Sequence, residues 1–127
     1  MSAYEKLEKH FSEIANFEHA GGILNWDNAT MMPSGSADVR ASAMASLSVH
    51  IHALSTDPHI ADWVADAKNE SLDEWQAANV REIEREFTMN AAIPADLVEA
   101  LSTAASEGEQ AWRSMREENN WQDFKHH

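Results

Sequence analysis

Apolar residues recur at intervals of three and four positions through most of the chain, and this spacing marks one face of an α-helix. The first such run places Tyr4, Leu7 and Phe11 on one face and continues to Leu24 and Trp26. No segment alternates apolar and polar residues over the length that a half-buried β-strand would need. The sequence therefore predicts an all-α fold.

One sharp interruption separates the first helical run from the second. Met31 and Met32 precede Pro33, and a residue before proline is pushed out of the helical region of backbone space. The side chain of Ser34 or of Ser36 can then cap a second helix. We therefore expect the first helix to end at Pro33, in a corner that leads into the second.

The corner carries several large apolar side chains, and their position suggests a hydrophobic anchor. We expect Trp26, Met31 and Met32 to be largely buried there. Asp27, next to a buried tryptophan at a helix end, could accept backbone hydrogen bonds and hold the corner.

The remaining periodic segments predict about five helices in one layered all-α body, a single domain over residues 1–127. The expected apolar faces after the corner are, in chain order, Met44, Leu47, Ile51 and Leu54; Ile60, Trp63, Val64 and Ala67; Leu72, Trp75, Val80, Ile83 and Phe87; and Leu97, Leu101, Ala104, Gly108, Ala111, Trp112 and Met115. Asn119 and Asn120 break the last long helix, and Trp121 and Phe124 begin another element.

Local signals mark where several helices start. Ser2 with Glu5, and Ser71 with Glu74, have the spacing of a capping box. Pro58 suits the first position of a short third helix. The adjacent glycines 21 and 22 cost about 1 kcal/mol each against alanine inside a helix, so we expect close helix packing or a kink there.

Composition excludes several classes of function. The net charge is −13, from 22 acidic and 9 basic residues, and nucleic-acid phosphates would repel such a chain. No apolar run approaches the ~20 residues that a membrane-spanning helix needs. The chain has no cysteine, and its polar first residues do not form a secretory signal. These features fit a cytoplasmic protein.

The segment from Leu24 to Pro33 resembles the N-terminal region of the carboxypeptidase Taq family of metallocarboxypeptidases, which carries a similar Leu-x-Trp-Asp-x-x-Thr-x-Met-Pro pattern. Five further segments are similar to that family in its order, namely Tyr4–Leu7, Leu54–Pro58, Ala78–Glu82, Ile93–Val98 and Glu109–Arg113. None of them is a catalytic motif, so the likeness depends on the ordered set.

The resemblance implies an all-α peptidase that removes C-terminal residues from peptides with a divalent metal, zinc or cobalt. The family's site rests on His-Glu-x-x-His, where two histidines on one helix face bind the metal and the glutamate activates water. That motif does not occur here, because no two histidines lie four residues apart. We therefore predict no catalytic, cofactor-binding or metal-binding residue in this chain, and no activity from it alone.

The histidines that are present do not form a convincing metal site. His50 and His52 point to different sides of a helix. The pairs His10 with Glu13 and His59 with Asp62 would supply only two ligands each, and a terminal pair such as 126 and 127 binds metal unspecifically. A metal-binding helical bundle would need Glu-x-x-His on facing helices, and this motif is absent.

The likeness stops about one helical turn into the family's next element, so the chain looks like roughly the first quarter of a family member. It could be a truncated piece, a proteolytic fragment or the product of a short gene. The resemblance also allows Trp26 and Asp27 to line a substrate groove. The alternative function is a non-catalytic helical interaction module. In either case we expect a homodimer or larger assembly that forms contacts through the last long helix and its tail. The apolar side chains that it would bury are Trp112, Met115, Trp121 and Phe124, together with Trp63 on the short third helix.

Overall fold

The computed structural model describes residues 1–127, apart from the side chain of Ser34. The prediction of an all-α fold is confirmed, since no described residue lies in a β-strand. The elements are, in order, α1 (Ala3–Thr30), the short 3-10 helix η1 (Ser34–Ser36), α2 (Ala37–Ser55), α3 (His59–Ala67), α4 (Glu74–Ala91), α5 (Ala95–Glu117) and α6 (Trp121–Phe124).

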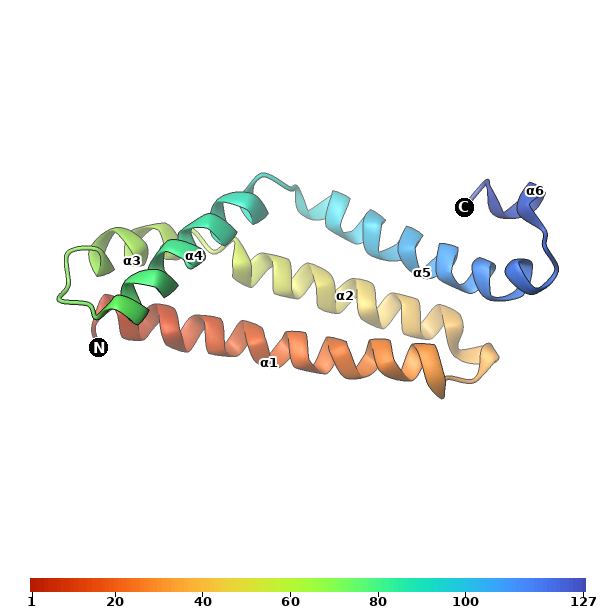
Figure 1. Cartoon of the computed structure of the whole chain (residues 1–127), viewed down its shortest axis with the longest axis horizontal. Coiled ribbons are helices and arrows are strands. Elements are labelled where there is room, and N and C mark those ends of the chain that lie inside the picture. Colours follow the sequence, from red (N-terminus) through yellow and green to blue (C-terminus); the bar gives the residue numbers. More distant parts are fainter.

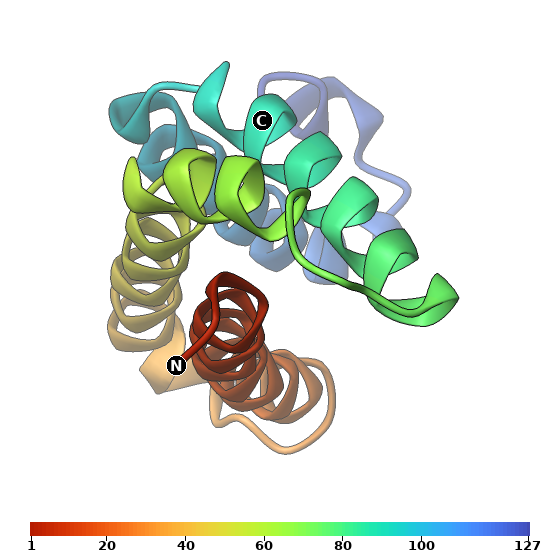
Figure 2. The same cartoon turned by 90° about the vertical axis from the view of Figure 1, so that its left-hand side faces the viewer.

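Two long helices form the base of the molecule. α1 and α2 lie antiparallel as a hairpin, and α5 runs along the other side of α2 (Figure 1). α3 and α4 pack at the end of the hairpin that holds the N-terminus, and α6 lies at the opposite end beside the end of α5. Seen end-on along the hairpin, α3 and α4 cross in front of the three long helices α1, α2 and α5 (Figure 2).

The main apolar core cluster lies at the end of the hairpin that carries the N-terminus, and Ile14 and Ala45 are buried outside it. Its largest fully buried side chains are Leu7 of α1, Ile60 of α3 and Val80 of α4. Other members of this cluster are Ala3, Tyr4, Val64 and Ala67, with Phe11, Trp63, Leu72, Ile83 and Phe87 packed against it. These positions are the ones that helical periodicity selects. We call this region the core end.

The start of α1 is capped twice at the core end. Ser2 and Glu5 form the predicted capping box, with the Glu5 N–H 3.1 Å from Ser2 Oγ and the Ser2 N–H 2.7 Å from Glu5 Oε2. Glu70, in the α3–α4 loop, also accepts a hydrogen bond from the Ala3 N–H at 2.6 Å. These backbone hydrogen bonds hold the pKa of Glu70 below its ordinary value. A distant loop therefore satisfies a free donor of α1.

The prediction of a second capping box at Ser71 and Glu74 is wrong. Asp73 is the N-cap of α4, and its carboxylate accepts the Gln76 N–H at 2.8 Å, while Gln76 Oε1 accepts the Asp73 N–H at 3.0 Å. Aspartate caps helices as well as serine does. The later start leaves Leu72 in non-helical chain, from which it packs against the core.

Of the other local predictions, the break after the last long helix is confirmed, whereas a kink at the adjacent glycines and Pro58 as the first residue of α3 are not. α1 runs unbroken through both glycines, and a Cβ on Gly21 would make only ordinary contact, at 3.4 Å, with Leu47 of α2. Asn119 adopts a left-handed conformation with φ of 53°, as residues that end helices often do. The predicted break at Asn119 and Asn120 is therefore confirmed. Pro58 is the N-cap of α3 rather than its first residue.

Candidate functional site

The corner between α1 and α2 has the predicted boundaries. α1 ends at Thr30 with Met31 as its C-cap, and Pro33 is in extended conformation with φ −62° and ψ 143°. Ser36 precedes α2 without a side-chain capping bond, and the side chain of Ser34 lies outside the described part of the chain.

The prediction of a buried apolar corner is wrong. Trp26 is 61% exposed and Met31 is 68% exposed, whereas Met32 is half-buried. The inward face of α1 at this point is formed by Leu24 and Asn28, which are four residues apart. Trp26 lies two residues from each, so the helix turns it roughly to the opposite side.

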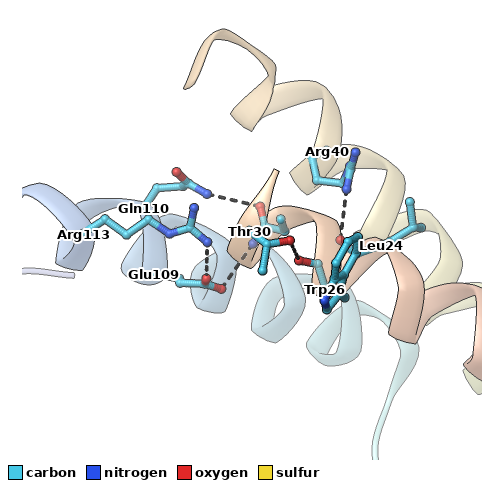
Figure 3. A network of polar contacts seen from close by, with 8 residues as sticks. Leu24, Trp26, Thr30, Arg40, Glu109, Gln110 and Arg113 are labelled. Carbon is cyan, nitrogen blue, oxygen red and sulfur yellow. Dashed lines mark hydrogen bonds and ion pairs between the residues drawn. The ribbon is translucent and has the colours of Figure 1, made fainter. Parts of the chain in front are cut away.

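Arg40 of α2 holds the corner. Its Nη2 lies 2.5 Å from the Asp27 carboxylate, and its Nη1 donates to the Leu24 carbonyl oxygen at 2.9 Å (Figure 3). Both charged side chains are partly shielded, at 21% and 32% exposed. Asp27 therefore stabilises the corner as predicted, but through a side-chain ion pair rather than by accepting backbone hydrogen bonds.

Asn28 connects α1 with α5. It is buried, at 5% exposed, and its Nδ2 donates to Glu109 Oε2 at 3.3 Å, while its Oδ1 accepts from Gln110 Nε2 at 3.3 Å. Arg113 holds the other oxygen of Glu109 at 2.6 Å, and Figure 3 shows these side chains of α5 directed toward the end of α1. We call this set, with Arg40 and Asp27, the polar clamp.

Asn28 was not among the residues predicted for the corner, although its position in the sequence carried a signal. The inward positions of α1 run through Ile14, Phe17, Gly21 and Leu24 at intervals of three and four, and Asn28 is the next member of that series. A polar residue that continues an apolar stripe must find hydrogen-bond partners when it is buried. Its partners lie on α5, more than 80 residues away in the sequence.

The side of α5 that helical periodicity predicts to be apolar faces outward. Leu97 is 45% exposed, Leu101 is 58% exposed and Trp112 is 44% exposed, and no residue of this 23-residue helix is buried. The side that faces α2 and α1 is largely polar, with Ser102 Oγ 3.5 Å from Ser48 Oγ and with Gln110 at the polar clamp, although Val98 lines a hollow there together with Ile51 of α2. The helix is therefore amphipathic with its apolar side unpartnered.

An apolar hollow lies where α5 meets α6. Its volume is about 300 Å³, and it is lined by Trp112, Met115, Arg116, Asn119, Asn120, Trp121 and Phe124. The Arg116 guanidinium lies 4.9 Å from the Trp112 ring centre, and Trp121 remains 64% exposed. The hollow thus brings together Trp112, Met115, Trp121 and Phe124, the four apolar side chains predicted for the last long helix and its tail, whereas Trp63 packs against the core.

Two of the histidines, His10 and His59, pack against Trp63 and form hydrogen bonds. His10 Nε2 lies 2.8 Å from the Leu54 carbonyl oxygen, and His59 Nδ1 lies 2.7 Å from Asp57 Oδ1. Both rings lie against Trp63. The hydrogen bond from the His59 backbone lowers the pKa of Asp57. Among the described side chains, no group of three histidine, aspartate or glutamate residues could hold a metal ion.

No helix in the described part of the chain is long and apolar enough to cross a membrane.

Comparison with known proteins agrees with the likeness in the sequence. Residues 6–127 match the family of carboxypeptidase Taq (M32) metallopeptidases. The chain is 32% identical to thermostable carboxypeptidase 1 of Thermus thermophilus over 97% of its length, and 29% identical to thermostable carboxypeptidase 1 of Pyrococcus furiosus over 84%. It spans only 25% and 22% of those two proteins.

A solved structure extends the match to three dimensions. Metallocarboxypeptidase 1 of Trypanosoma cruzi superposes on 96% of the chain with a TM-score of 0.75 and 31% sequence identity, and the match covers 25% of that protein. The arrangement of helices described above therefore recurs within a much longer polypeptide. With nearly the whole chain matched in sequence and in fold, the protein belongs to the carboxypeptidase Taq (M32) family of metallopeptidases.

Proposed function

We propose that this chain is the N-terminal, non-catalytic portion of a metal-dependent carboxypeptidase that removes C-terminal residues from peptides. The supporting observation is that almost the whole chain matches one quarter of its relatives, while it lacks His-Glu-x-x-His. The described residues do not fit a metal ion, so zinc or cobalt would be bound by the rest of the enzyme. We also propose a single domain and a cytoplasmic location.

The role that suits the chain is that of a rigid helical wall beside a catalytic body. The polar clamp fastens α1 to α2 through Arg40 and fastens α1 to α5 through Asn28. Directional hydrogen bonds of this kind fix the spacing of helices where no apolar core does so. The exposed Trp26 beside the clamp then becomes available as a wall residue of a substrate groove.

A peptidase assay tests this function. The purified chain is incubated with zinc or cobalt and an N-blocked dipeptide, alone and after refolding with the remaining three quarters of the Thermus thermophilus relative. We expect no release of the C-terminal amino acid by either polypeptide alone and release by the mixture. Metal-dependent release by the chain alone, surviving repurification and chelation controls, would refute the proposal.

A second candidate function is a self-associating helical module. The observation that favours it is the apolar hollow at α5 and α6, where Trp121 is 64% exposed. Exposed apolar patches mark association sites, and a symmetric dimer is the commonest solution. Light scattering on the parent and on a Trp121→Ala/Phe124→Ala variant separates the two, since a monomeric parent across micromolar concentrations excludes the module.

A further inference from the structure

The hollow that Val98 shares with Ile51 lies among four helices, where the turn between α4 and α5 comes over the α1–α2 hairpin (Figure 1). Its volume is about 320 Å³, and α1, α2, α4, α5 and that turn all contribute to its walls. Small molecules bind in hollows of this size when a few polar groups converge on an apolar lining. We call it the four-helix hollow, and its polar lining consists of Glu18, Ser48, His52, Ser55, Glu86 and Asn90.

Two carboxylates reach the four-helix hollow without a partner. Glu18 of α1 and Glu86 of α4 line it from different helices, and neither forms an ion pair or a hydrogen bond with another described residue. None of the described residues around the hollow is a lysine or an arginine. The hollow therefore offers two uncompensated negative charges, which a cationic ligand would complement.

The hydroxyl of Ser55 is a second and independent sign of a ligand. Ser55 is 4% exposed, and its side chain makes no hydrogen bond to a described residue, whereas the neighbouring Thr56 hydroxyl donates to the His52 carbonyl oxygen at 2.8 Å. Every fully enclosed polar side-chain atom in the described part of the chain has a partner. The Ser55 hydroxyl must therefore reach the hollow that it lines, where it is free to bond a ligand.

The rest of the lining favours an organic cation over a metal ion. Ile51, Ile93 and Val98 supply apolar surface, while His52 and Asn90 supply neutral hydrogen-bonding groups. Methylene groups are stabilised by contact with such apolar side chains. No group of three acidic or histidine side chains among the described residues could hold a metal ion. A cation with a hydrocarbon body fits both the charges and the apolar lining.

We propose that the four-helix hollow binds a short linear diamine, a molecule with an ammonium group at each end of an aliphatic chain. One ammonium group pairs with Glu18 and the other with Glu86, because a charge that leaves water needs an opposite charge. The methylene groups lie against Ile51 and Val98, and Ser55 accepts a hydrogen bond from an ammonium group. This binding does not depend on the proposed peptidase function.

The test is a titration of the isotope-labelled chain with the diamine putrescine, followed by amide NMR spectra at about pH 7. Salt at ~0.15 M screens the general attraction of a cation to a chain of net charge −13. Glu18→Gln/Glu86→Gln removes both proposed charges, and Ser55→Ala removes the hydroxyl. The matched control is Glu13→Gln/Glu107→Gln, which removes the same charge from exposed positions on α1 and α5. The spectra also show that each variant is folded.

We expect putrescine to shift the amide signals of Ser55 and Asn90 to saturation. Butylamine, with one ammonium group on a chain of the same length, should bind roughly tenfold more weakly. Glu18→Gln/Glu86→Gln should weaken putrescine binding roughly tenfold or more and Ser55→Ala about threefold, while the control variant binds like the parent.

Three results would overturn the proposal. A control variant that loses as much binding as Glu18→Gln/Glu86→Gln would show that putrescine follows the net charge alone. Equal binding of butylamine and putrescine to the parent would exclude recognition of a diamine. Shifts at Ser55 that never saturate, or that persist unchanged in Glu18→Gln/Glu86→Gln, would exclude the four-helix hollow as the site.

Discussion

The two ends of the α1–α2 hairpin are stabilised by different means. At the core end, Leu7, Ile60 and Val80 from three helices are completely or almost completely buried. At the far end, Arg40 and Asn28 join the helices through ion pairs and hydrogen bonds, and large apolar side chains point outward. The core end is thus complete within this chain, while the far end presents a surface.

Magnitudes indicate which end carries the stability of the isolated chain. Full burial of one large apolar side chain contributes about 1.5–3 kcal/mol, whereas a typical hydrogen bond contributes a net 0.5–1.5 kcal/mol or so. A partly exposed ion pair contributes about 0–1 kcal/mol. The core end therefore decides whether the chain folds, and the polar clamp decides how the three long helices are spaced.

The largest effect should come from the core end. Leu7→Ala removes a side chain with 0% exposure, so we expect a loss of about 2–5 kcal/mol in the free energy of unfolding. Leu101→Ala removes the same side-chain atoms from the exposed apolar side of α5, and it should change the free energy of unfolding by under about 0.5 kcal/mol. Urea denaturation followed by circular dichroism measures both, and equal losses would remove the contrast between the two ends.

The polar clamp should give the next largest effect. Asn28→Ala leaves Gln110 and one oxygen of Glu109 without their buried partner, and we expect a cost of about 1–3 kcal/mol. Asn25→Ala, on an exposed position of the same helix, is the matched control and should stay within about 0.5 kcal/mol. A neutral Asn28→Ala in the same urea experiment would show that the clamp does not hold α5.

A smaller effect should appear on acidification, through Glu70. Its pKa is lowered in the folded state by the Ala3 backbone hydrogen bond, so its contribution to stability is present above its ordinary value and is lost as the pH falls through the folded pKa. Between about pH 6 and pH 3, the parent should lose more stability than Glu70→Gln, which has no charge to neutralise. Parallel curves for the two proteins would exclude this role.

The smallest effect should come from the corner. Trp26 is 61% exposed, so Trp26→Ala should change the free energy of unfolding by under about 0.5 kcal/mol. A buried tryptophan would cost about 3–5 kcal/mol. Denaturant melts distinguish these values, and a loss in the larger range would place Trp26 in a packed environment after all.

The sequence predicted the core end far better than the far end, for a physical reason. At the core end, periodicity and burial agree for Leu7 and Val80 because their partners lie within the chain, although Trp75, which was placed on the same predicted face as Val80, is 76% exposed. The periodicity of α5 was equally clear around Leu101, but it cannot tell whether the apolar side meets a neighbouring helix or a surface outside the chain. Trp26 was predicted buried because size and hydrophobicity were weighed above its position on the helix.

The polar clamp was not predicted because the residues that form it lie far apart in the sequence. Nothing local to Asn28 indicates that Glu109 and Gln110 will lie beside it. The only sequence signal for Asn28 is its place at the end of the inward series of α1. Such a position predicts a buried polar residue but does not identify its hydrogen-bond partner. Asp27 was assigned to the corner correctly, but its partner Arg40 belongs to the next helix.

Amide hydrogen exchange tests most directly the claim that one end is complete and the other awaits a partner. In the isolated chain, the amides around Leu7 and Val80 should exchange only through global unfolding, while those of α5 exchange through local opening. Adding the remaining three quarters of the Thermus thermophilus relative should slow exchange in α5 selectively. Equal protection of α5 and the core end in the isolated chain, or no gain in α5 within the complex, would contradict the claim.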